Sequence, residues 1–225
     1  MTSSHSSAFP RGKGLPDQSP LFWVQQKDRY LRQLLIRDIE DRTGRRLIVY
    51  FANRFVENSD IDNGDIALLT EALGDVAGEP CDLMLTTNGG ATDATEALVS
   101  LIQAMVSDLR VVVPHSAKSN GTMICLAAKS IVMGPPSELG PIDPSIAGTP
   151  TSILATQEVR AQNFALHKLA LYAIEQTKKL ATSLLTAGMM RGREKTVNDA
   201  TVQKLASRDQ FHSHGSEINH QEASA

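Results

Sequence analysis

The stretch that decides the fold runs from His115 to Gly134 and reads H-S-A-K-S-N-G-T-M-I-C-L-A-A-K-S-I-V-M-G. A short polar turn around Ser119 leads directly into an apolar run from Met123 to Ala128, and a second apolar run, Ile131–Met133, follows. This order predicts a strand, a sharp turn, a buried helix and another strand, with Ser119 at the start of the helix.

Ser119 has two alternative roles at that position. Serine is among the residues that most often cap a helix, because its hydroxyl accepts a hydrogen bond from a backbone N–H of the first turn. Those first N–H groups have no partner inside the helix, so the same turn can hold a nucleophile beside donors for an oxyanion. On this stretch alone the capping role is favoured, since a serine before a helix is common.

The composition excludes several classes of protein. The 225 residues are 41% hydrophobic and 21% charged, which is enough for one sizeable core. The 22 Lys+Arg nearly balance the 25 Asp+Glu, so no broad basic surface for nucleic acid is expected. No apolar run approaches the ~20 residues that a membrane span needs. No cofactor or metal is indicated, because Cys81 and Cys125 lack the spacing of paired ligands and are expected to be buried free thiols.

The domain organisation expected from the sequence is simple. Residues 1–20 are rich in Ser, Pro and Gly and lack the apolar core of a signal peptide, so they are expected to form a flexible tail. Residues 21–225 are expected to form a single domain with an N-terminal helix at about 21–41. The free cysteines fit a reducing, cytoplasmic setting.

Strands and helices alternate in the first part of this domain. Short apolar runs predict strands at 47–51, 83–85, 110–114 and 131–133, the first of them buried on both faces. Apolar residues at helical spacing predict helices at about 66–76 and 92–107. This alternation indicates parallel crossover units and an α/β layer architecture. After a proline-rich loop, a long C-terminal helical region is predicted at about 152–187, as one helix or two, and at 196–207.

Two turns follow strands of the predicted sheet, Asn88-Gly89-Gly90 and Ser119-Asn120-Gly121. Because the carboxyl ends of parallel strands share one edge of a sheet, the two turns are expected to meet there. Paired glycines let backbone N–H groups approach an oxyanion closely. The two turns would therefore supply a nucleophile and oxyanion donors, and acyl transfer would still need a base.

Four segments, Leu83–Gly90, Ala117–Thr122, Ile131–Gly134 and Leu139–Pro144, carry a family resemblance in their order and spacing. They resemble the serine dehydrogenase proteinase family, a relative of signal peptide peptidase A in the Clp protease/crotonase superfamily. The resemblance covers about residue 47 to the C-terminus and implies a Clp/crotonase fold of repeated ββα units. It also implies a serine peptidase.

The resemblance further implies roles for single residues. Ser119 corresponds to the nucleophile, and this moves its expected role from cap to catalysis. Gly89 and Gly90 match the threonine-proline-glycine-glycine turn of the family and would line the oxyanion hole with the backbone N–H of Asn120. Asn88 replaces the usual proline of that turn, and Asn120 replaces the alanine usual after the serine.

No motif assigns the base. The Clp protease pattern has a histidine downstream of the serine, where this sequence reads G-P-I-D-P at 140–144, so the serine–lysine dyad of signal peptide peptidases is the better analogy. The candidate bases are Lys168 and Lys178 on the predicted helical region and His214 near the C-terminus, whereas Lys118 is expected to point away from Ser119. A lysine base would need burial to lower its pKa.

The leading hypothesis is a cytoplasmic, homo-oligomeric serine peptidase that cleaves a peptide or protein through an acyl-enzyme on Ser119. One alternative is a catalytically silent scaffold or assembly protein of the same fold, suggested by Asn88, Asn120 and the missing base. The other is an acyl-thioester binder of the crotonase kind.

Overall fold

The computed structural model describes residues 19–53, 55–57 and 59–224. The chain divides into two compact units, one ending at Leu47 and one beginning at Ile48. The tail expected at residues 1–20 lies, apart from its last two residues, outside the described part of the chain.

The first unit contains helix α1, Pro20–Thr43, where the sequence predicts a helix at about 21–41. Ser19 caps its start, because the serine hydroxyl accepts a hydrogen bond from the Phe22 N–H at 3.1 Å. The helix ends at Gly44, whose φ of 65° lies in the left-handed region that glycine adopts without strain.

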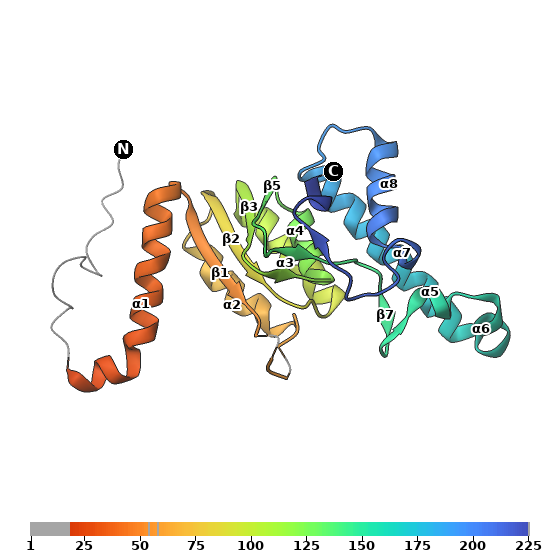
Figure 1. Cartoon of the computed structure of the whole chain (residues 1–225), viewed down its shortest axis with the longest axis horizontal. Helices are drawn as coiled ribbons and strands as arrows, with labels where there is room; N and C mark the ends of the chain where they lie inside the picture. Colours follow the sequence, from red (N-terminus) through yellow and green to blue (C-terminus); the bar gives the residue numbers. More distant parts are fainter. Residues whose placement is uncertain (1–18, 54, 58, 225) are drawn as a thin grey trace. The chain divides into compact units, whose positions relative to one another are not determined.

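Four strands form the central sheet in the order β1-β2-β3-β5 (Figure 1). Their bounds are β1 Arg46–Phe51, β2 Pro80–Thr86, β3 Asp108–Val113 and β5 Ser130–Met133. The last three are parallel, with Leu83 opposite Val111 and Val111 opposite Ile131. The α/β architecture predicted from the alternating pattern is confirmed.

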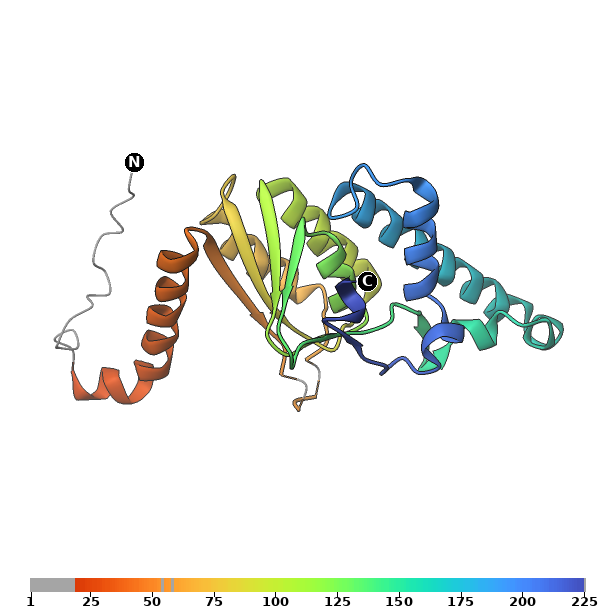
Figure 2. The ribbon, with the colours of Figure 1, turned by 45° about the horizontal axis from the view of Figure 1, so that its top comes forward.

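Three helices connect these strands: α2 Gly64–Gly74, α3 Thr92–Met105 and α4 Asn120–Leu126. α2 and α3 pack against each other on one face of the sheet (Figures 1 and 2). Their apolar stripes and the inward side chains of the strands form the core, with Leu73, Leu85, Leu98, Ile102, Val111, Val113 and Met123 almost fully buried. Burying each such side chain contributes roughly 1.5–3 kcal/mol. Cys81 and Cys125 are buried free thiols, as expected.

Strand β1 is not buried on both faces, so that expectation for 47–51 is wrong. Ile48 is buried, but the side chains of Val49 and Phe51 are 45% and 68% exposed. β1 is the first strand in the sheet order, and among the described residues only β2 pairs with it. A continuous apolar run is typical of a central parallel strand, and the run alone does not show that the strand lies at the end of its sheet.

A second, smaller sheet lies beside α4 and contains strands of only two residues. Its order is β4-β6-β9, with bounds Ser116–Ala117, Glu138–Leu139 and Ile218–Asn219. β4 and β6 are parallel, and β6 and β9 are antiparallel. Strands β7 (Ser145–Ile146) and β8 (Thr149–Pro150) form a separate antiparallel pair. Such short strands leave no periodic pattern by which the sequence could predict them.

The C-terminal region is helical, as predicted, but begins with three helices where the sequence predicts one or two. These are α5 Thr151–Leu154, α6 Gln157–Gln162 and α7 Phe164–Ala187, with α5 and α6 packed beside α7 (Figure 1). α8 Lys195–Leu205, α9 Arg208–Phe211 and a short 3₁₀ turn, Glu222–Ser224, follow. None of the helices in the described ranges is long and apolar enough to cross a membrane.

The end of α7 anchors this helical region on the core. Gly188 follows α7, and a Cβ at this residue would come within 2.8 Å of the Ala128 carbonyl oxygen and 2.9 Å of the Leu126 carbonyl oxygen. Glycine therefore allows the end of α7 to approach the backbone at the end of α4. α4, which Ser119 precedes, packs against α3, α7 and the short strand β4.

Candidate active site

Ser119 lies in a sharp turn between β4 and α4. Its backbone has φ 52° and ψ −119°, a conformation that costs a non-glycine residue on the order of 1–3 kcal/mol. The surrounding hydrogen bonds impose it: the Gly121 N–H donates to the Lys118 carbonyl at 2.7 Å, and the Met123 N–H donates to the Ser119 carbonyl at 3.2 Å. A serine on a strained strand-to-helix turn presents its hydroxyl away from the backbone, as nucleophilic serines do on other α/β folds.

The hydroxyl of Ser119 does not cap the helix. Ser119 occupies the N-cap position of α4, but its side chain accepts no hydrogen bond from the first turn. No other group in the described part of the chain forms a hydrogen bond with this hydroxyl, and the residue is half-buried. The capping role that the local sequence favours is therefore wrong, and the hydroxyl is available for chemistry.

The Gly89–Gly90 turn lies directly against Ser119. A Cβ on Gly89 would be 2.8 Å from the Ser119 Cβ and 3.0 Å from the Lys118 carbonyl oxygen, and the φ of Gly89 is 106°. A side chain at Gly89 would displace the serine, so glycine is needed for this close approach. The expectation that the two turns meet is confirmed.

Backbone pairing brings the two turns together. Thr87, directly after β2, forms a parallel bridge with Ala117 of β4. The Thr87 N–H donates to the Ser116 carbonyl, and the Lys118 N–H donates to the Thr87 carbonyl, both at 3.0 Å. The large and the small sheet are thus joined immediately before the two turns begin.

The N–H groups of the two glycines differ in their partners. The Gly89 N–H donates to the Thr87 hydroxyl at 3.1 Å, and the Gly89 carbonyl accepts from the Ile61 N–H at 2.8 Å. In a trans peptide the N–H points opposite to the carbonyl, so the Gly90 N–H points away from Ile61. No acceptor in the described ranges forms a hydrogen bond with the Gly90 N–H. The Asn120 N–H, the first of α4, also has no carbonyl partner within its helix.

The two lysines predicted as candidate bases have partners away from Ser119. Lys168 is exposed, and its ammonium lies 5.8 Å from the centre of the Phe164 ring on the same helix. The Lys178 ammonium donates to the Gln203 side chain of α8 at 2.7 Å. No hydrogen bond between described residues joins either lysine to Ser119.

His214, the third candidate, belongs to a cluster of charged side chains that the sequence does not reveal. Its Nδ1 lies 2.8 Å from Oδ1 of Asp143, and the Arg208 Nε donates to Oδ2 of the same carboxylate at 2.6 Å. Asp143 is 4% exposed, whereas the His214 side chain is 38% exposed. Because a carboxylate only accepts hydrogen bonds, Nδ1 is the donor in this contact, and Nε2 is not bonded to Asp143.

The partners of Asp143 keep it ionised. Burial by itself would raise the pKa of Asp143, but the hydrogen bonds from His214 and Arg208 and their charges outweigh burial and lower the pKa below its ordinary value. The carboxylate can therefore hold the imidazole of His214 in one orientation. The sequence predicts no role for Asp143 or Arg208. Asp143 lies within the Leu139–Pro144 segment of the family resemblance, but it is 71 positions from His214, so the sequence does not reveal their contact.

The strand register places this cluster at the same end of the small sheet as Ser119. Ala117 is opposite Leu139 on parallel β6, so the chain leaves both strands at one end, toward Ser119 and Asp143. On antiparallel β9, Ile218 is opposite Leu139, so the preceding residues, His214 among them, approach from that end. No hydrogen bond joins His214 to Ser119 among the described residues.

Lys118 points away from Ser119, as the sequence suggests. Its ammonium donates to the carbonyl oxygens of Leu139 and Ser216, each at 3.2 Å, and forms an ion pair with Glu138 at 3.0 Å. Lys118 therefore ties the C-terminal segment that carries His214 to the strand that leads to Ser119.

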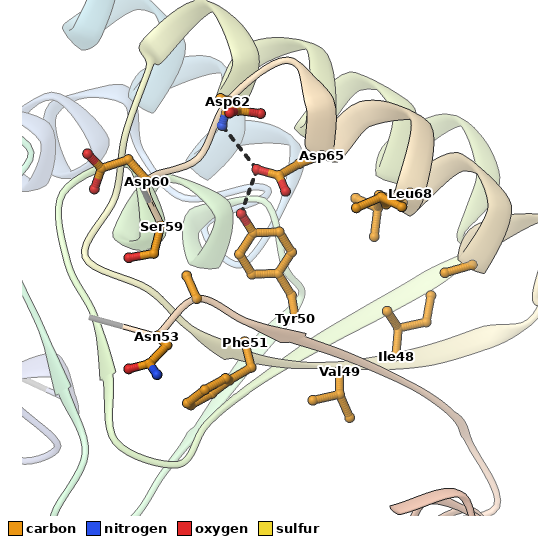
Figure 3. Close-up of a pocket in the computed structure, with 13 residues that line it drawn as sticks. Ile48, Val49, Tyr50, Phe51, Asn53, Ser59, Asp60, Asp62, Asp65 and Leu68 are labelled. Carbon is orange, nitrogen blue, oxygen red and sulfur yellow. Dashed lines mark hydrogen bonds between the residues drawn. The ribbon is translucent and has the colours of Figure 1, made fainter. Parts of the chain in front are cut away.

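A separate pocket of about 380 Å³ lies between β1 and α2 (Figure 3). None of the residues lining it belongs to the Ser119 turn or the Gly89–Gly90 turn. Inside it, the Tyr50 hydroxyl donates to Asp65 at 2.8 Å, and the Asp62 N–H donates to the same carboxylate at 3.0 Å. Burial and the bond to Asp65 raise the pKa of Tyr50. These bonds hold Asp62 next to Ile61, and the Ile61 N–H in turn donates to the carbonyl of Gly89.

The fold resembles that of a solved ClpP1 structure. A point mutant of ClpP1 from Listeria monocytogenes matches with a TM-score of 0.52 at 17% sequence identity, over 86% of this chain and 90% of that chain. At this identity the likeness concerns the fold alone, and it confirms the Clp/crotonase fold class implied by the sequence motifs.

Residues 25–214 match the family described as ClpP-like SDH-type serine proteinase, and the chain belongs to that family. Two uncharacterized proteins of Methanocaldococcus jannaschii, MJ0137 and MJ1495, are also similar. They are 35% identical over 114 residues and 32% identical over 112 residues. The matches cover 48% and 47% of this chain but only 40% and 38% of the two relatives, so the chain spans less than half of their length.

Proposed function

We propose that the chain is a serine peptidase with Ser119 as its nucleophile. The observation that carries this proposal is the unpaired hydroxyl of Ser119, held on a strained turn directly against Gly89. Structural serines normally use their hydroxyl as a cap or a local hydrogen-bond partner, and the strain at a functional turn is commonly retained for chemistry. Membership of the serine proteinase family supports the same class of reaction.

The oxyanion donors in this proposal are the N–H groups of Gly90 and Asn120. Both lack an acceptor of their own, whereas the Gly89 N–H is bonded to Thr87. Gly89 contributes by leaving the space through which the turn approaches Ser119. Removing one donor of an oxyanion hole typically costs about 10²–10³-fold in rate.

The base is His214, oriented by Asp143. The contact of Nδ1 with a buried carboxylate leaves Nε2 to accept the proton of a serine hydroxyl, which is the arrangement of histidine bases in serine hydrolases. Neither Lys168 nor Lys178 has the burial that a neutral lysine base requires. His214 is on the segment that Lys118 ties to the nucleophile strand.

The reaction is acyl transfer. The Ser119 Oγ attacks the carbonyl carbon of a peptide bond while its proton passes to Nε2 of His214, and the oxyanion forms against the two N–H groups. The C–N bond then breaks, and the leaving amine takes the proton from His214. A water molecule, deprotonated by the same imidazole, hydrolyses the acyl ester and restores the serine. The substrate we propose is a peptide or protein, and the working form is a cytoplasmic homo-oligomer.

A fluorophosphonate probe tests this function. Wild-type protein is expected to become labelled on Ser119, as shown by peptide mass spectrometry, and Ser119→Ala is expected to remain unlabelled. Ser100→Ala, which removes an exposed serine hydroxyl on α3, serves as the matched control and should label normally. Equal labelling of wild type and Ser119→Ala would contradict the proposal. A stable oligomer with no labelling at any pH would instead favour the silent scaffold.

A further inference from the structure

The side chain of Asn120 connects the two turns of the candidate site. Its Nδ2 donates to the Gly90 carbonyl at 2.6 Å and lies 3.3 Å from the Thr92 hydroxyl at the start of α3. Asn120 is 8% exposed, so these bonds are shielded from water. Within the described ranges, Asn120 is the only donor to the Gly90 carbonyl.

The glycine turn needs such a restraint. Two consecutive glycines have more backbone freedom than any other residue pair, and an oxyanion donor works only if it is already aimed before the reaction. Ile61 and Thr87 fix the carbonyl and the N–H of Gly89. The carbonyl of Gly90 belongs to the next peptide, whose Ala91 N–H donates to the Ile61 carbonyl at 2.8 Å. Asn120 holds the opposite side of that peptide and is the contact that links it to the nucleophile turn.

The preceding residue does not restrain the turn. Asn88 is exposed, and neither its side chain nor its backbone N–H forms a hydrogen bond with another described residue. It is not among the non-glycine residues with positive φ in the described ranges. A proline at 88 would therefore remove no hydrogen bond and would limit the freedom of the turn.

We propose that the Asn120 carboxamide is a positioning residue that holds Gly90 in register with the nucleophile. This inference rests on the proposed function, because Asn120 would contribute one oxyanion donor from its own N–H and aim the other through its side chain. Backbone pairing brings the two turns together, and the Asn120 side chain adds a direct link between the residues that carry the two donors.

The test compares the inactivation kinetics of a fluorophosphonate probe. Asn120→Ala keeps the backbone donor and removes the tether, so the maximal rate of phosphonylation should fall about tenfold, the effect of one buried hydrogen bond. The probe concentration for half-maximal rate should stay within twofold, because ground-state binding is unaffected. Asn120→Asp, which has the same shape but cannot donate when ionised, should be at least as slow. An unchanged maximal rate in Asn120→Ala would overturn the proposal.

Asn198 provides the matched control. It is a buried asparagine on α8, 4% exposed, and its Nδ2 donates to Thr186 at 3.4 Å. Both residues are far along the chain from the two turns. Asn198→Ala should label at the wild-type rate. If both alanine variants slowed equally, the loss of a buried amide would be a general structural effect, and the positioning role would be excluded.

Asn88→Pro provides the rescue. In the Asn120→Ala background it should recover most of the lost rate, whereas in the wild-type background it should change the rate less than twofold, because the turn is already held. If Asn88→Pro changed the labelling rate equally in the two backgrounds, a proline at 88 and the Asn120 side chain would not restrain the same turn.

Amide hydrogen exchange separates this inference from the proposed function. Exchange in residues 85–95 should be faster in Asn120→Ala than in wild type and unchanged in Asn198→Ala. If the probe failed to label wild type but exchange was faster in Asn120→Ala, the proposed function would be wrong. The bond from the Asn120 side chain to Gly90 would still be shown to restrain the turn. Unchanged exchange in Asn120→Ala would overturn the tether even in an active enzyme.

Discussion

The two halves of the candidate site are built from different kinds of contact. The nucleophile half, Gly89–Gly90 with Ser119, is made by backbone groups that approach within van der Waals distance and are fixed by main-chain hydrogen bonds. The base half, Asp143, Arg208 and His214, is made by ionisable side chains that meet from two distant segments, the loop at Asp143 and residues 208–214.

This difference predicts how each half responds to change. A site made of close backbone contacts cannot accept an added methyl group, but it carries no titrating group and is insensitive to pH. A site made of charged side chains accepts changes of shape more easily, but it depends on the ionisation of Asp143. Substitutions in the two halves should therefore differ in their effect and in their pH dependence.

The largest effect is expected from Gly89→Ala. The new Cβ would lie 2.8 Å from the Ser119 Cβ, so the turn must separate from the nucleophile, and labelling by the fluorophosphonate probe should become undetectable. Gly148→Ala is the control: Gly148 also has a positive φ, 75°, but no atom lies within 4 Å of its added Cβ. Normal labelling of Gly89→Ala would show that the two turns need not touch.

His214→Gln should follow, with a loss of about 10²–10⁴-fold in labelling rate, the usual contribution of a general base. His212→Asn is the matched control, since His212 is exposed in the same segment and asparagine tolerates its φ of 58°. A His214→Gln variant as fast as wild type would remove His214 from the proposed machinery.

Asp143→Asn is expected to lower stability in a pH-dependent way. The lowered pKa of Asp143 means that its contribution is present above the ordinary carboxyl value of about 3.9 and is lost as the pH falls through the lower folded value. At pH 7 the variant should lose about 2 kcal/mol of unfolding free energy, and the difference from wild type should begin to shrink as the pH falls below about 4. Chemical denaturation at several pH values measures this.

Asp199→Asn is the control for that series, because Asp199 forms an exposed ion pair with Lys195 on one helix. This substitution should change the free energy of unfolding by no more than about 1 kcal/mol. If the gap between wild type and Asp143→Asn were the same at pH 3 and pH 7, the carboxylate of Asp143 would not be the stabilising species.

The smallest effect is expected from Lys168→Met combined with Lys178→Met. Both ammonium groups have partners outside the Ser119 turn, so the labelling rate should remain within twofold of wild type. A loss of a hundredfold or more in the labelling rate would indicate that a lysine of α7 is the base in place of His214.

Local patterns in the sequence allowed the prediction of the α/β architecture and of the two turns, through the apolar periods of strands and helices and the glycines after strands. For Ser119 the local pattern favoured a helix cap, and only the family resemblance made it the candidate nucleophile. The burial of β1 was predicted wrongly because an apolar run does not reveal the number of neighbouring strands.

Only the tertiary structure decided the rest. The pairing of His214 with Asp143 joins residues 71 positions apart, and the amide of Asn120 reaches Gly90 30 positions earlier in the chain. In the sequence, Asn120 is merely an unusual neighbour of the serine and a reason to suspect lost activity. Contacts between distant segments leave no periodic trace in the sequence, because they are set by how the sheets and helices pack.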